Sequence, residues 1–315
     1  MKRSYLLFIM LALAVPLTLS SCAKDDAVEG QKNIVELAQG NSDLSSLVAA
    51  VKRAGLVDAL SDATKQFTVF APTNAAFTTF LNANGFANLE AVPVSVLQNL
   101  LLNHVLGAEV KAAAVTTGYV NTLATYGTSA SHVDMFINTT GGVQINGLSK
   151  VVAADVDASN GVVHVVDAVI PVPSVPTFAV ANPDFSILVQ ALTRSDLAAN
   201  YASVLSGPGP FTVFAPTNAA FAALLSELGV AALKDIPAAT LEAVLTYHVA
   251  SGNVLAGSLT EGQQVTTLQK GNFTVRLAGG AKITDANNRV INIIATDIQG
   301  GNGVVHAIDK VLLPK

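Results

Sequence analysis

The sequence predicts an α+β protein that is built from two copies of one domain. An 11-residue segment, FTVFAPTNAAF, occupies 67–77 and recurs unchanged at 211–221, which is 144 residues later. His104 and His248 have the same separation. Two closing segments, GVVHVVDAVI at 161–170 and GVVHAIDKVL at 303–312, lie 142 residues apart. This period is far longer than that of a solenoid repeat and suits a domain of ordinary size.

Each copy begins with an amphipathic helix. Leu44, Leu47, Val48 and Val51 follow helical spacing, and Asp43 is a candidate N-cap. The counterpart lies at 181–201, where Asp184 precedes the apolar run.

The duplicated segment predicts a strand followed by a helix. FTVF is aromatic and β-branched, and Pro72 in the first copy and Pro216 in the second end the strand. In the first copy Thr73 or Asn74 can cap the next helix, and Phe77 then faces the core from its first turn.

The later part of each copy predicts one more helix and then strands. Helices are expected near 94–105 and 239–249, each ending in its histidine. The closing segments are almost continuously apolar, which predicts strands that are buried on both faces. PVPSVPT at 171–177 is proline-rich and predicts a semi-rigid spacer between the copies.

The composition excludes several classes of protein. Half of the residues are hydrophobic, 12% are charged, and the net charge is −5. An acidic chain without a basic stripe does not favour nucleic-acid binding. The single cysteine excludes an intramolecular disulfide, so packing must supply the stability.

The N-terminus resembles the signal of a bacterial lipoprotein. Lys2 and Arg3 precede an apolar run at 6–19, which is followed by Leu-Ser-Ser-Cys at 19–22. The resemblance implies a signal peptide at 1–21, a lipid on the Cys22 sulfur and a lipidated tether at 22–32. The alternative is an ordinary secretory signal with an incidental cysteine.

Lys24-Asp25-Asp26 in the tether resembles short acidic signals that export lipoproteins to the cell surface. We therefore expect an outer-membrane lipoprotein of the cell envelope that is displayed at the surface. The alternative is that these residues are only a solvated tether.

The three repeated motifs together resemble the fasciclin-like domain. They are TVFAPTNAAF, Tyr247-His248 in the middle of a copy, and NGVVHVVDAVIP at 160–171. The resemblance implies two tandem domains, 33–173 and 174–315, each a β-wedge with flanking helices. It also implies adhesion and matrix contact rather than catalysis, with no cofactor.

The same resemblance supplies the candidate binding residues. The Tyr-His motif falls on Tyr247 and His248, whereas the first copy has Asn103 before His104. An Asp-Ile pair that animal members use for integrin contact falls on Asp297-Ile298, and Asp155 begins a partial match. The alternative for each Asp is a cap or turn before the last strand.

The histidines do not indicate catalysis or a metal site. None of the five forms the close-spaced patterns of zinc ligands. His164 and Asp167 are three residues apart on a predicted strand, so they point to opposite faces. A hydrogen-bonded structural histidine is the better interpretation.

These observations predict a non-enzymatic adhesion lipoprotein. Its expected partners are the membrane, through the lipid anchor, and an unidentified surface protein or glycan. The alternative is a periplasm-facing binding protein for a small apolar ligand or an envelope component, which the apolar composition would suit.

Overall fold

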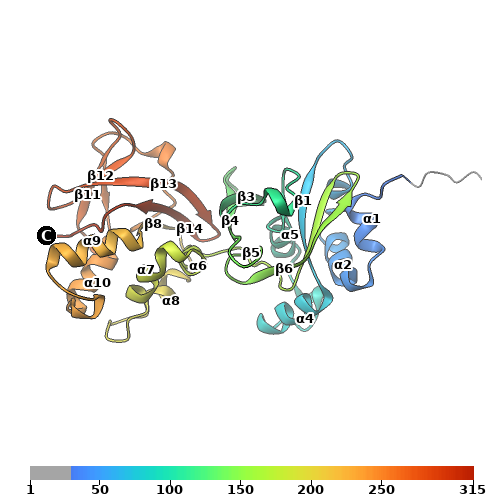
Figure 1. Cartoon of the computed structure of the whole chain (residues 1–315), viewed down its shortest axis with the longest axis horizontal. Coiled ribbons are helices and arrows are strands. Elements are labelled where there is room, and N and C mark those ends of the chain that lie inside the picture. The colour runs from blue at the N-terminus through green and yellow to red at the C-terminus, as the bar shows by residue number, and fades with distance from the viewer. Residues whose placement is uncertain (1–29) are drawn as a thin grey trace, which may run out of the picture. The chain divides into compact units, whose positions relative to one another are not determined.

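The computed structural model of the protein describes residues 30–315, of which Lys32–Lys315 form one compact unit. It contains two seven-stranded sheets with the same strand order (Figure 1). The first has the order β2-β1-β7-β6-β5-β4-β3, and the second, read from its other end, is β9-β8-β14-β13-β12-β11-β10. The α+β fold with two similar domains is therefore confirmed. The signal peptide and Cys22 lie outside the described residues.

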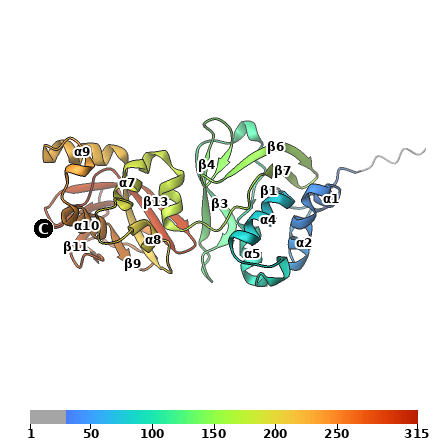
Figure 2. The same cartoon turned by 90° about the horizontal axis from the view of Figure 1, so that it is seen from below.

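The strands of domain 1 alternate with helices only at its beginning. Its strands are β1 (Phe67–Pro72), β2 (Val105–Leu106), β3 (Gly118–Thr125), β4 (His132–Asn138), β5 (Gln144–Ile145), β6 (Ser149–Ala158) and β7 (Gly161–Val166). Its helices are α1 (Ile34–Gln39), η1 (Ser42–Leu44), α2 (Ser45–Arg53), α3 (Val57–Leu60), α4 (Asn74–Ala83), η2 (Leu89–Ala91), α5 (Val94–Leu102) and η3 (Ala112–Ala114). Figure 2 shows α1, α2, α4 and α5 grouped beside β1.

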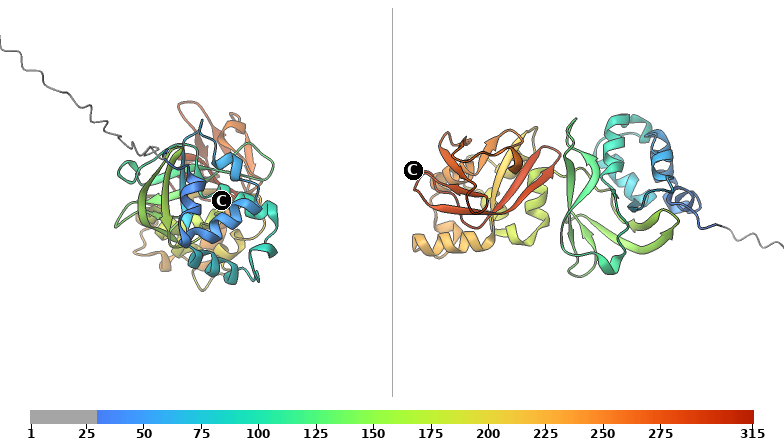
Figure 3. Two further views of the ribbon diagram at one scale, coloured as in Figure 1. Left: turned by 90° about the vertical axis from the view of Figure 1, so that its right-hand side faces the viewer. Right: turned by 90° about the horizontal axis from the view of Figure 1, so that it is seen from above.

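Domain 2 repeats these elements. Its strands are β8 (Phe211–Pro216), β9 (Val249–Ser251), β10 (Gln264–Thr266), β11 (Asn272–Arg276), β12 (Lys282–Thr284), β13 (Val290–Gly300) and β14 (Gly303–Ile308). Its helices are α6 (Val175–Ala181), η4 (Pro183–Phe185), α7 (Ser186–Leu192), α8 (Tyr201–Leu205), α9 (Asn218–Leu228), η5 (Leu233–Asp235), α10 (Ala238–Tyr247) and η6 (Ala256–Ser258). Figures 1 and 3 show α6 to α10, in yellow and orange, gathered along one side of the red strands.

The duplicated segment builds the centre of each domain. β1 runs parallel to β7, and β8 runs parallel to β14. Thr73 caps α4 and Thr217 caps α9, each by accepting a hydrogen bond from the backbone N–H three residues later. The capping prediction is therefore confirmed for threonine. The closing strands β7 and β14 are almost wholly buried, as their apolar sequences predict.

The predicted cap of the opening helix is wrong. Asp43 lies inside the 3-10 turn η1, and the cap of that turn is Asn41. The free N–H of Ser46 in α2 instead donates to Oδ1 of Asn74, at 2.8 Å. Domain 2 has the same arrangement, since the N–H of Ile187 donates to Oδ1 of Asn218 at 2.9 Å. The asparagine of the duplicated segment thus binds the opening helix to the central strand–helix unit.

The predicted spacer at 171–177 is only half correct, because α6 already begins at Val175. Pro176 is tolerated in the first turn of a helix, where its missing N–H has no intrahelical partner. α6 then packs against β4 of domain 1, and Phe136 of β4 joins the core cluster that contains Phe178 and Ile298 of domain 2. The junction between the domains is therefore a packed interface as well as a linker.

Candidate functional site

His104 and His248 hold in place the segment that follows the closing strand of each domain. Nδ1 of His104 donates to the carbonyl of Leu100 at 2.8 Å, and Nε2 accepts from the N–H of Ile170, also at 2.8 Å. His248 repeats both bonds with Val244 and Leu312, at 2.7 and 2.9 Å. Burial lowers the pKa of each ring to about 4, so both rings are neutral at pH 7. Both nitrogens are occupied inside the protein.

Tyr247 lies beneath the surface rather than on it. Its ring is fully buried and meets Phe273 edge to face. Its hydroxyl donates to the carbonyl of Asn272 at 2.7 Å and accepts from the N–H of Ala286 at 3.2 Å. Burial raises the pKa of this hydroxyl. In domain 1 Asn103 occupies the position that corresponds to Tyr247, and its side-chain amide donates to the carbonyl of Ile170.

Asp155 and Asp297 occupy matching irregularities in the long strands β6 and β13. Both have positive φ, 58° and 60°, at the point where the strand register shifts. Asp297 accepts a hydrogen bond from the N–H of Ala256 at 2.7 Å, and Asp155 accepts one from Ala112 at 2.8 Å. Each carboxylate thus holds the start of a 3-10 turn. Contact with a partner through these residues stays a prediction.

The companion of Asp297 is not available on the surface. Ile298 is 3% exposed and belongs to the core cluster of domain 2. Its counterpart in domain 1, Val156, is 39% exposed. Domain 1, which matches the Asp-Ile motif only in part, therefore exposes an apolar side chain at this position, whereas domain 2 buries it.

His164 and His306 support the same bulges. Nδ1 of His306 accepts from the N–H of Asp297 at 3.2 Å, while Nε2 donates to the carbonyl of Val254 at 2.9 Å. His164 makes the equivalent bonds with Asp155 and Val110. Burial lowers the pKa of His306. Among residues 30–315, no cluster of three or more His, Cys, Asp or Glu side chains could hold a metal ion.

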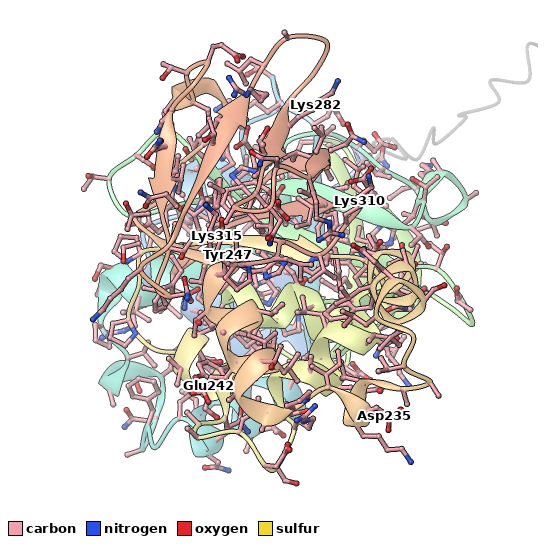
Figure 4. The ribbon with its side chains drawn as sticks, turned by 90° about the vertical axis from the view of Figure 1, so that its left-hand side faces the viewer. Asp235, Glu242, Tyr247, Lys282, Lys310 and Lys315 are labelled. Carbon is pink, nitrogen blue, oxygen red and sulfur yellow. The ribbon has the colours of Figure 1, made fainter. Side chains whose placement is uncertain are left out.

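The sequence reasoning did not predict a polar groove at the end of domain 2. The groove has a volume of about 520 Å³, and Tyr247 forms part of its floor. We call it the Lys270 groove. Its polar lining comes from three separate segments and includes Lys270, Asn272, Thr274, Thr284, Asn288 and Lys315. Figure 4 shows Lys315 beside Tyr247, with Lys282 and Lys310 toward one side and Glu242 and Asp235 toward the other.

Backbone strain accompanies this groove. Lys270 and Asn288 have φ values of 73° and 60°, a region that non-glycine residues rarely occupy. Lys270 sits in a tight turn in which its N–H donates to the carbonyl of Thr267 at 2.9 Å. The sequence signals available were only Lys-Gly at 270–271 and Asn-Asn at 287–288, which indicate turns but not a shared surface.

The apolar cavities inside the domains are small. In domain 1 a cavity of about 30 Å³ lies among α1, α2, α3, α5 and β1, with His104 at its edge. In domain 2 a cavity of about 20 Å³ lies under α6, α7 and α8. Each has room for about one water molecule. Neither could hold a small apolar ligand without rearrangement of the core.

Comparison with known proteins places the chain in a family. Residues 42–173 and 183–314 match the fasciclin domain. The chain belongs to the fasciclin family, and it carries two fasciclin domains in tandem. No helix within residues 30–315 has the length and apolar character needed to cross a membrane.

The similar proteins include bacterial and animal proteins. The uncharacterized protein sll1735 of Synechocystis is 36% identical over 45% of this chain and 98% of its own length. Protein sll1483 of the same organism is 42% identical over 48% of this chain and 79% of its own length. Human periostin is 31% identical over 79% of this chain, which corresponds to 28% of periostin.

A solved structure supports the fold of the tandem pair. The FAS1 domain pair from the insect cell adhesion molecule fasciclin I has a TM-score of 0.52 to this protein. The alignment covers 87% of this chain and 98% of that one, at 20% identity. At this identity the likeness concerns the fold alone.

Proposed function

We propose that this protein is a non-enzymatic adhesion protein of the cell envelope, anchored by a lipid on Cys22 and displayed at the cell surface. The observation that carries the proposal is the pairing of two fasciclin domains with an N-terminal lipoprotein-like signal. The solved fasciclin pair to which the chain is similar comes from a cell adhesion molecule.

The described residues support binding rather than catalysis. The four histidines at the duplicated positions 104, 164, 248 and 306 use both ring nitrogens in hydrogen bonds within the protein. The two bulge carboxylates accept backbone hydrogen bonds. Because these side chains already form hydrogen bonds within the protein, we expect the protein to act through its exposed surfaces.

The enclosed cavities give no support to the alternative of a carrier for a small apolar ligand, and the larger apolar hollow of about 840 Å³ beside Leu224, Val244 and Leu313 is an open groove. Pockets that enclose such ligands typically have volumes of several hundred Å³. The enclosed cavities of about 30 and 20 Å³ are more than tenfold smaller.

Protease treatment of intact cells tests the proposal. Cells that express the wild-type protein are exposed to protease, with the Cys22→Ser variant as the control for lipid anchoring. Digestion of the wild-type protein on unbroken cells, and loss of the variant from the cell surface, are the expected results. Protection until the outer membrane is permeabilised would contradict surface display.

A further inference from the structure

The two domains use one equivalent sheet face in different ways. Tyr119 lies opposite Phe136 in domain 1, and Gln264 lies opposite Thr274 in domain 2. The neighbouring pairs, Ile137 with Ile145 and Val275 with Ile283, fix the same correspondence. Phe136 therefore corresponds to Thr274, and Asp134, two residues earlier, corresponds to Asn272.

In domain 1 this face is covered by domain 2. Oδ2 of Asp134 accepts a hydrogen bond from the N–H of Gln299 at 2.7 Å. The hydroxyl of Tyr119 accepts from Nδ2 of Asn182 at 3.1 Å, and its ring packs edge to face on Phe178. The apolar side chains and the buried Asp134 carboxylate of this face are therefore in contact with domain 2.

In domain 2 the equivalent face is polar and hollow. Asn272 and Thr274 replace the carboxylate and the phenyl ring, and both line the Lys270 groove. Amide and hydroxyl side chains can each donate and accept hydrogen bonds. A lining of this kind does not suit an apolar occupant, but it matches the hydroxyl groups of a sugar.

The side-chain charge of the groove is positive because Asp285, its single acidic side chain, is already neutralised. Asp285 accepts from the N–H groups of Asn287, Arg289 and Leu313, and its carboxylate lies 3.5 Å from the Arg289 guanidinium. Lys270 and Lys315 form no ion pair with any residue in 30–315. The two lysine side chains therefore line the groove without an acidic side chain of residues 30–315 as a partner, and the α-carboxylate of Lys315 offsets one of their two charges.

The turn that presents Lys270 is built at a conformational cost. A non-glycine residue with positive φ costs about 1 kcal/mol, and such strain persists where surrounding structure enforces it. The next residue, Gly271, packs closely against the domain, because a Cβ at this position would lie 2.7 Å from Oε1 of Gln269 and 3.0 Å from the Tyr247 ring. The turn thus fixes a lysine at the rim of the groove.

We propose that the Lys270 groove binds a carboxylate-bearing oligosaccharide, such as a chain of uronic acids. Lys270 and Lys315 contact the carboxylates, and Asn272, Thr274, Thr284 and Asn288 contact the hydroxyl groups. The groove is open to solvent, and its volume of about 520 Å³ lies within the range of small-molecule sites. The proposal rests on the proposed adhesion function and names the chemical class of its ligand.

Binding is expected to be weak and sensitive to salt. The Tyr247 ring is buried, so no aromatic face is offered for stacking on a sugar, and the charge contacts are open to solvent. Many weak contacts along one polysaccharide, made by many copies on one cell, would supply avidity.

The test is titration of the purified protein with a tetramer of galacturonic acid. The variant Lys270→Gln/Lys315→Gln is compared with Lys282→Gln/Lys310→Gln, which removes the same charge from the same end of the domain outside the groove. We expect about tenfold weaker binding for the first variant and less than twofold for the second. Chemical-shift changes should map to the amides of Asn272, Thr274 and Asn288.

Three outcomes would overturn the proposal. They are equal binding by the two variants, equal binding of neutral maltotetraose, and equal or tighter binding of tetraglutamate, which would make the groove an acidic-peptide site. The measurement is independent of cell location. If the purified protein binds the oligosaccharide but is protected from protease on intact cells, surface display alone is contradicted. If it is digested on intact cells but does not bind, the groove proposal alone is contradicted.

Discussion

Nε2 of His248 accepts a hydrogen bond from the backbone N–H of Leu312, at 2.9 Å and 64 residues further along the chain. The other ring nitrogen binds the carbonyl of Val244 in the last turn of α10. One side chain therefore joins a helix to the segment that follows the final strand. His104 makes the same connection in domain 1, to Ile170.

Replacement of either histidine by alanine should destabilise its own domain. His248→Ala leaves the N–H of Leu312 buried without a partner and opens a cavity, for a loss of about 3 kcal/mol. Chemical denaturation of the variant measures this loss. His132→Ala, at an exposed position, is the matched control and should change stability by less than about 0.5 kcal/mol. Equal effects of the two substitutions would show that the connection is not structural.

The same histidines predict how stability depends on pH. Their pKa is about 4 in the folded protein and about 6.5 when unfolded, so the unfolded chain binds more protons between these values. Stability is therefore full above pH 6.5 and falls as the pH drops toward 4. Asp134 acts in the opposite direction, because burial raises its pKa to about 6 and its protonation favours the folded state at low pH.

Two histidines outweigh the single carboxylate, so the net slope between pH 6.5 and 4 should be a loss of stability. Denaturation midpoints measured across this range test it. The slope should become shallower in His104→Gln and His248→Gln, whatever their stability at pH 7. An unchanged slope in both variants would contradict neutral buried histidines.

Gly303 has a steric role at the start of β14. A Cβ at this position would lie 2.1 Å from the carbonyl oxygen of Phe211, the residue that begins the neighbouring parallel strand. Gly303→Ala should therefore separate the two central strands and cost more than about 3 kcal/mol. Gly257→Ala meets no atom within 4 Å and serves as the control. Similar melting temperatures for the two variants would refute the steric argument.

Asp297 should tolerate asparagine but not alanine. Asparagine accepts the same hydrogen bond from Ala256 and adopts positive φ readily, so Asp297→Asn should cost less than about 0.5 kcal/mol. Asp297→Ala loses the cap and adds backbone strain, for a total of about 2 kcal/mol. Thermal unfolding distinguishes them. If the two variants are equally stable, the carboxylate has no capping role.

The sequence patterns were informative where one local motif determines one element. The threonine cap, the prolines that end the strands and the apolar closing strands were all predicted, because each depends on neighbours in the chain. The cap at Asp43 was wrong because the actual partner of α2 is Asn74, which only the tertiary fold brings near. The spacer prediction fails in its second half because a proline is permitted in the first turn of α6.

The groove could not be predicted for a related reason. Its lining comes from segments near 270, 285 and 315, which meet only after β11 and β12 have paired and the C-terminal residues lie beside them. The positive φ of Lys270 also leaves no trace in hydrophobic periodicity. Comparison of the two domains reveals the site, since their shared frame shows where one copy has exchanged an apolar face for a polar one.

Attachment of living cells to a uronate-coated surface tests the central claim most directly. Cells that carry the wild-type protein, the Lys270→Gln/Lys315→Gln variant or the Lys282→Gln/Lys310→Gln variant are compared under flow, after protease treatment has shown equal display. The account predicts that attachment falls only in the first variant and that 0.5 M salt removes the difference, since salt at this level screens exposed charges within roughly 4–5 Å. Equal attachment of all three, with equal display, would contradict adhesion through this groove.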